Sequence, residues 1–145
     1  MTEIPFHFNV ADKLLYACRL LRKAYASGAQ VAVTAEPEVL GELDQLLWSF
    51  SASDFVPHCR MGPVSEFLAR SPVLLVDSSA TCPHHGVLIN LGLQVPSEFD
   101  RFERIIEVVT QGHDERLAAR VRWKHYADSG YSPQKHDVAA QRGGI

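Results

Sequence analysis

The sequence predicts an α/β domain in three layers, with a mostly parallel sheet and helices on both faces of that sheet. Short β-rich runs alternate along the chain with longer segments of helical period, as in βαβ units. One of these runs, Val73–Val76 (VLLV), is wholly apolar, which is typical of a buried strand. The length of 145 residues and the hydrophobic share of 46% suit one domain with a single core.

The elements of the first third follow from periodicity and from helix-end signals. Residues 4–10 alternate apolar residues with polar or small ones, which is the period of a strand. Asp12 suits the N-cap of a following helix, and Gly28 suits its end. The run at 30–34 (QVAVT) is a second short strand. A proline opens the next helical segment, 37–50, where the first turn accepts it.

The rest of the chain is less regular. The expected elements are strands at 55–59, 73–76, 86–91 and 101–109, a weak helix at 64–69, a loop at 78–85 and a last helix at about 114–129. The domain is expected to comprise residues 1–131. The segment 132–145 (SPQKHDVAAQRGGI) shows no apolar period and is expected to be a loose C-terminal tail.

Composition argues against several classes of protein. The formal net charge of −3 provides no global positive field for nucleic acid, so contact with nucleic acid is expected to be indirect only. Three cysteines without framework spacing fit a reducing compartment, so a cytoplasmic protein is expected. The N-terminus (MTEIPFHFNVADK) is not expected to be a signal peptide, and no segment approaches the roughly 20 apolar residues of a membrane span.

The motifs of nucleotide-binding and hydrolytic enzymes are missing. No Gly-x-Gly-x-x-Gly and no Gly-Lys-Ser/Thr loop follows any expected strand, so the domain lacks a nucleotide-binding glycine loop and no cofactor is expected. Asp77 does follow the apolar strand, and Ser78 comes next, but the nucleophile elbow Gly-x-Ser-x-Gly is absent. A small enzyme that uses Asp77, Ser78, His84 or His85 is the alternative function.

Two clusters raise the question of a metal site. His58 precedes Cys59, and Cys82-Pro83-His84-His85 follows later. Neither cluster repeats as the paired ligands that a structural zinc site needs, so no metal is expected.

Trp48 is placed unusually on the segment 37–50. On a wheel of about 100° per residue, the leucines of this segment share one apolar arc. Trp48 lies nearly opposite the centre of that arc, so it is expected to point outward. Tryptophan is the most over-represented anchor at protein interfaces, and Phe55 could widen the patch. A covering loop is the alternative.

A second anomaly occurs on the last expected helix. Arg116, Arg120, Trp123 and Lys124 stand at i, i+4, i+7 and i+8 and share one arc of about 100°. Such a stripe can be a merely solvated face. An aromatic wall rimmed by cations also suits a short acidic peptide that ends in an apolar side chain, because the cations would bind carboxylates.

Several segments occur together in the order and spacing of one protein family. They are Ser27–Val33 (SGAQVAV), Leu47–Trp48 with Asp54–His58 (DFVPH), Val87–Leu91 (VLINL) with Phe99, Phe102, Arg104, Glu107 and Val108, and Arg120–Tyr126 (RVRWKHY). In these segments the chain resembles the chi subunit family of the bacterial DNA polymerase III clamp-loader complex, over about residues 4–131.

This resemblance implies a Rossmann-like fold and a non-catalytic bridging role, as a monomer or a one-to-one heterodimer. One face would bind the acidic, Phe-terminated tail of single-stranded DNA-binding protein, and another would bind the psi subunit or a helicase. The tail-binding residues carried over by the resemblance are Val109, Arg116, Arg120, Trp123 and Lys124. Trp48 and Phe55 would form the psi or helicase face.

Overall fold

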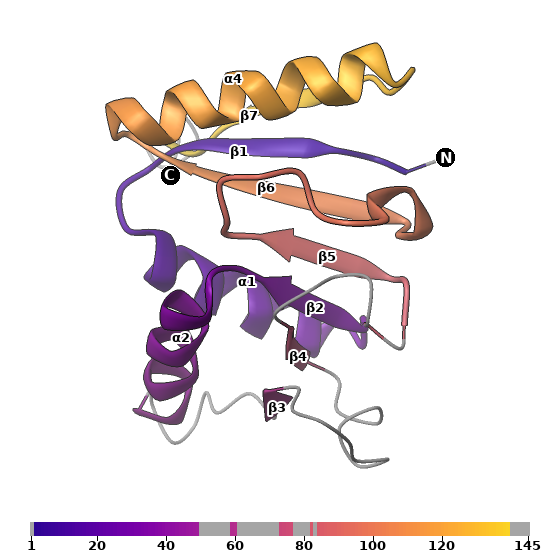
Figure 1. Cartoon of the computed structure of the whole chain (residues 1–145). Coiled ribbons are helices and arrows are strands. Elements are labelled where there is room, and N and C mark those ends of the chain that lie inside the picture. The colour runs from indigo at the N-terminus through magenta and orange to yellow at the C-terminus, as the bar shows by residue number, and fades with distance from the viewer. Residues whose placement is uncertain (1, 50–58, 61–72, 77–81, 83, 140–145) are drawn as a thin grey trace.

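A computed structural model describes residues 2–49, 59–60, 73–76, 82 and 84–139 of the chain. Its elements in order are β1 (Pro5–Val10), α1 (Lys13–Ala26), β2 (Val31–Thr34), α2 (Pro37–Ser49), β3 (Cys59–Arg60), β4 (Val73–Val76), β5 (Val87–Asn90), the 3-10 helix η3 (Phe99–Arg101), β6 (Arg104–Thr110), α4 (His113–Asp128) and β7 (Gln134–Asp137). The seven strands form one sheet in the order β3-β4-β2-β5-β6-β1-β7 (Figure 1). All six strand pairings are parallel, so the predicted α/β class is confirmed.

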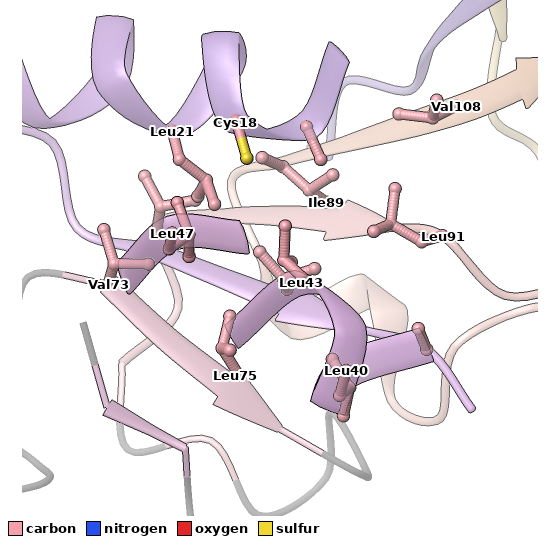
Figure 2. Packing of buried hydrophobic residues seen from close by; sticks show 14 of the residues in the cluster. Cys18, Leu21, Leu40, Leu43, Leu47, Val73, Leu75, Ile89, Leu91 and Val108 are labelled. Carbon is pink, nitrogen blue, oxygen red and sulfur yellow. The ribbon is translucent and has the colours of Figure 1, made fainter. Parts of the chain in front are cut away.

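Helices α1 and α2 cover one face of the sheet. Asp12 caps α1, since its carboxylate accepts a hydrogen bond from the Leu15 amide at 3.1 Å. After the last turn of α1, Gly28 adopts a φ of 81°, a conformation that favours glycine. Figure 2 shows the leucines of α2, including Leu43 and Leu47, pointing onto the strands together with Leu21 of α1. This packing forms the largest cluster of the core.

Helix α4 lies on the opposite face, along β1 and β6 (Figure 1). Alternate side chains of a strand point to opposite faces, so Phe6 of β1 and Val109 of β6 turn toward α4. Both are buried in one cluster with Ala119 and Tyr126 of α4. The helices therefore cover both faces, as predicted.

A buried polar network fixes α4 against the sheet. The carboxylate of Glu107 in β6 is fully buried and accepts hydrogen bonds from Arg122 at 2.9 Å and from the Tyr126 hydroxyl at 2.6 Å. Asn90 of β5 donates to the same carboxylate at 3.0 Å. Burial and the neighbouring Glu107 raise the pKa of Tyr126 far above its usual value, which keeps the phenol a donor. Arg122 also donates to the Leu93 carbonyl at 3.1 Å, so the network joins α4 to the loop after β5.

The expectation of a loose tail at 132–145 is wrong for residues 134–137. These residues form β7, which pairs in parallel with β1 at the end of the sheet. The run QKHD has no apolar alternation because its residues are exposed or half-buried, and it is held mainly by backbone pairing. Such a strand leaves no apolar period in the sequence by which it could be predicted.

Other boundaries shift slightly. The segment expected as a strand at 101–109 begins as the end of η3 and becomes strand β6 only from Arg104. The last helix starts at His113 and ends at Asp128, one residue earlier at each end than expected. The weak helix at 64–69 lies outside the described residues, as do most of the strand at 55–59 and of the loop at 78–85.

Candidate functional site: a groove beside α4

A groove of about 390 Å³ runs between α4 and the strands β1, β6 and β7. Its lining is drawn from all four elements and consists of Phe6, Phe8, Asn9, Val109, Thr110, Arg116, Ala119, Arg120, Trp123 and Lys135. The segments that meet here are far apart in sequence, since β1 begins at Pro5 and β7 ends at Asp137.

The floor of the groove is apolar. Phe6, Val109 and Ala119 are buried, and they lie in one cluster with the partly buried Phe8 and Trp123. The Trp123 ring packs against the Phe6 ring, with centroids 5.0 Å apart and planes tilted by 55°. A floor of this kind removes an apolar side chain of a ligand from water.

The rim of the groove is cationic. Arg116 and Arg120 stand one turn apart on the exposed side of α4. On the side of the groove formed by strand β7, the ammonium of Lys135 lies 5.9 Å from the centroid of the Trp123 ring. Among the described residues that line the groove there is no Asp or Glu, and neither arginine forms an ion pair with any residue that the structure describes. These cations are therefore available to carboxylates of a ligand.

The structure brings together four of the five residues expected to bind the tail. Val109, Arg116, Arg120 and Trp123 all line the groove. Lys124 does not line it: it is exposed, and it follows Trp123 around the helix toward solvent. On the helical wheel Lys124 shares an arc with Arg116, Arg120 and Trp123. The groove, however, borders only the part of that arc that lies nearest the sheet, and Lys124 lies at the far end of the arc.

Of the groove residues that the sheet supplies, the sequence predicts Val109 of β6 but not those of β1 and β7. Phe6 and Phe8 were assigned only to an alternating strand, although that alternation already indicates that they share a face. No signal in the sequence indicated Lys135, since it lies in the segment expected to be a loose tail.

Trp48 is exposed, as the wheel predicts. Its side chain on α2 is 63% exposed, while Leu43 and Leu47 of the same helix are buried. Helices α2 and α4 cover opposite faces of the sheet (Figure 1). Trp48 of α2 and the groove beside α4 therefore lie on different sides of the molecule. Phe55, its expected companion, lies outside the described residues.

Of the residues named for the alternative enzymatic function, His84 and His85 are the two that lie in the described part of the chain. Asp77 and Ser78 lie outside it. The Cys82 sulfur lies 4.0 Å from Nδ1 of the buried His84. Burial raises the pKa of the Cys82 thiol and lowers that of His84, so both groups stay neutral near pH 7.

Metal ligands do not gather among the residues that the structure places. Within those residues, no group of three or more His, Cys, Asp or Glu side chains could hold an ion. His58 lies outside them, so the His58–Cys59 pair is not described. In the same described part, no helix is both long enough and apolar enough to cross a membrane.

A second, smaller hollow of about 150 Å³ lies beyond the carboxyl ends of β2 and β5. α/β enzymes commonly bind ligands at this edge of the sheet. Here Glu36 is the one titratable side chain among the lining residues that the structure describes, and the amide of Asn90 is already bonded to Glu107 and to the Gln94 carbonyl. A carboxylate beside the hollow disfavours phosphate, in keeping with the missing glycine loop.

Comparison with solved structures bears on the fold. The C-terminal domain of the DEAD-box protein Dbp5 superposes with a TM-score of 0.61 and 14% sequence identity, covering 96% of this chain and 91% of that one. At this identity the likeness shows a shared α/β fold alone.

Comparison with sequences identifies the family. DNA polymerase III subunit chi of Pseudomonas aeruginosa is 35% identical over 141 residues, which cover 94% of this chain and 96% of that protein. The subunit of the same name in Haemophilus influenzae is 26% identical over 123 residues, covering 84% of this chain and 85% of that protein. The family model described as "DNA polymerase III chi subunit, HolC" matches residues 1–134. With this match over nearly the whole sheet and all of α4, the chain belongs to the chi subunit family of DNA polymerase III, a replication accessory subunit.

Proposed function

We propose that this chain is a non-catalytic adaptor that binds the acidic, Phe-terminated C-terminal tail of single-stranded DNA-binding protein and links it to the polymerase III clamp loader. The observation that carries the proposal is the groove beside α4, where an apolar floor and a cationic rim occur together. Membership of the chi family supports the replication setting.

The groove matches the chemistry of such a tail at two levels. A terminal aromatic side chain would pack on Phe6, Val109 and Trp123, which removes its apolar surface from water. Carboxylates of the tail would bind Arg116 and Arg120 through charge-assisted hydrogen bonds, and guanidinium groups can bind them in bidentate fashion. Lys124, outside the lining, adds only to the local positive potential.

A second docking surface would make the protein a bridge. Trp48 is exposed on α2, on the opposite face of the sheet from the groove. We propose that Trp48, with Phe55, binds the psi subunit or a helicase. Because the two surfaces lie on opposite faces, a tail and this second partner can be bound at the same time by a monomeric chain.

The test of the tail site is a titration with a labelled acidic peptide ending in Pro-Phe. Arg120→Ala is expected to weaken binding by about 1.5–3 kcal/mol, the value of a hydrogen bond to a charged group. Amidation of the peptide's terminal carboxylate is expected to weaken binding as well. Because the rim is exposed, the affinity should fall as salt rises.

The matched control is Arg19→Ala. Arg19 is an exposed arginine on α1, the face of the sheet away from the groove, so its loss changes the net charge equally and should leave binding unchanged. Binding that withstands Arg120→Ala, or that falls equally with Arg19→Ala, would reject the groove as the site.

The second docking surface has its own test. Trp48→Ala should abolish binding of the second partner and leave the peptide affinity unchanged.

A further inference from the structure

We propose that β7 forms a second cationic wall of the groove and that Lys135 on this strand binds a carboxylate of the tail, opposite the arginines of α4. The inference rests on the proposed function, because it names a further binding residue for the same ligand. In this arrangement β7, the strand at the end of the sheet, binds the tail together with the cationic residues of α4.

The register of the sheet directs Lys135 to the groove. Lys135 pairs with Phe6 across the β1–β7 ladder, and neighbouring partners in a parallel ladder point to the same face. Phe6 lies on the α4 face and forms part of the groove floor. Lys135 accordingly lines the groove, while the next residue, His136, points to the other face with its partner His7.

Strand β7 is anchored on both of its faces, so the position of Lys135 is determined by the sheet. On the α1 face, the rings of His136 and His7 stack with centroids 4.5 Å apart. On the groove side, the Asn9 amide donates to the Asp137 carboxylate at 3.1 Å. These contacts join β7 to β1 just after Lys135, and the Gln134 amide, just before it, donates to the Ile4 carbonyl at 3.0 Å.

The ammonium of Lys135 is available for a ligand. Its nearest described aromatic partner is Trp123, at 5.9 Å from the ring centroid, and a cation–π contact at an exposed site is weak. Lys135 has no ion pair with any residue that the structure describes. A carboxylate that approaches along the β7 wall would therefore gain a cation without displacing an internal partner.

Two cationic walls imply a tail with negative charges at more than one position. An apolar side chain on the floor has Arg116 and Arg120 on the helix side and Lys135 on the strand side. Carboxylates at two positions along the tail would each bind one wall.

The test compares Lys135→Met with Lys23→Met in the full chain, titrated with the acidic peptide ending in Pro-Phe. Methionine keeps a flexible apolar chain and removes the charge. Lys23 is an exposed lysine on α1, on the far face of the sheet, and serves as the matched control. Lys135→Met should weaken binding about three- to tenfold and flatten its salt dependence, while Lys23→Met should do neither.

A double-mutant cycle identifies the carboxylate that Lys135 binds. Each peptide carboxylate is replaced in turn by its amide, and every peptide is titrated against the wild type and Lys135→Met. One replacement should weaken wild-type binding and have almost no further effect on Lys135→Met. Lys135→Arg, which keeps the charge, should retain most of the affinity.

The outcomes separate this inference from the proposed function. If Arg120→Ala weakens binding but Lys135→Met does not, or if no peptide carboxylate couples to Lys135, the wall formed by β7 is refuted while the adaptor function stands. If the peptide fails to bind the wild-type chain, both proposals fall together. Loss of binding in Lys135→Met and in Lys135→Arg alike would also count against recognition by charge.

Discussion

Arg122 of α4 and Glu107 of β6 form an ion pair at 2.9 Å whose side chains are only 2% and 0% exposed. The pair lies directly beneath the helix that carries Arg116, Arg120 and Trp123. It therefore holds the cationic side of the groove in place without touching the ligand site. Desolvation makes such a pair sensitive to the loss of one partner, because the remaining charge has no water to stabilise it.

Removal of the arginine alone is expected to destabilise the fold strongly. Arg122→Met leaves the Glu107 carboxylate buried with fewer donors, so the free energy of unfolding should fall by about 3–5 kcal/mol in a urea titration. The double variant with Glu107→Gln should recover part of this loss, because it removes the uncompensated charge and keeps an acceptor for Tyr126. A single variant within about 1 kcal/mol of wild type would contradict the structural role of the pair.

Acidification is expected to destabilise the domain through His7. Burial, and to a lesser extent the neighbouring His136, Arg104 and Lys23, lowers the pKa of this side chain to about 4; its Nδ1 also faces the Tyr16 hydroxyl. In the unfolded chain the pKa is about 6.5, so between these values the unfolded state binds more protons than the folded state. The stabilising contribution is complete above pH 6.5 and is lost as the pH falls toward 4.

The expected magnitude of this effect is about 1 kcal/mol, because water partly screens a half-buried ring. Urea titrations of the wild type and His7→Gln between pH 7.5 and 4 measure it as the difference between the two pH profiles. Parallel profiles for the two proteins would show that His7 does not titrate as described.

The exposure of Trp48 has a spectroscopic consequence. In the Trp123→Phe variant, Trp48 is the remaining tryptophan, and at 63% exposure its emission should be red-shifted and readily quenched by acrylamide. Binding of the second partner should shift the emission to the blue. A blue, poorly quenched emission in the unbound protein would refute the docking surface on α2.

One glycine is expected to be irreplaceable for steric reasons. A Cβ at Gly86 would lie 2.8 Å from the Gln30 carbonyl oxygen, a backbone atom that cannot easily move because it also accepts from the Val87 amide. Gly86→Ala should therefore lower the free energy of unfolding by about 2 kcal/mol. At Gly112 the nearest atom would be 3.5 Å away, so Gly112→Ala should cost about 0.5 kcal/mol as a slightly poorer N-cap. If the two variants lost equal amounts of unfolding free energy, the steric explanation for Gly86 would be wrong.

The fold was predictable where local signals are strong. Strand β4 is wholly apolar, and α1 begins at a capping aspartate and ends next to a glycine, so chain-local chemistry indicates both. Strand β7 was missed because its four residues are exposed or half-buried and its stability comes from pairing with β1, more than 100 positions earlier. No local sequence pattern indicates that these residues pair with β1.

The candidate site divides in the same way. The stripe of Arg116, Arg120 and Trp123 on one helix is a property of helical spacing and could be read directly. The exclusion of Lys124 and the inclusion of Lys135 depend on which edge of α4 faces β7. That orientation is determined by the buried Arg122–Glu107 pair and by the packing of Phe6 against Trp123.

By itself, the sequence determined the α/β class, the outward direction of Trp48 and the cationic face of the last helix, because periodicity and helix caps act over a few residues. The tertiary structure alone decided that this face becomes one wall of a groove, and that a polar strand from the end of the sheet supplies the other. A groove exists only when distant segments pack together, and the free energy of that packing is spread over contacts that no short stretch of sequence contains.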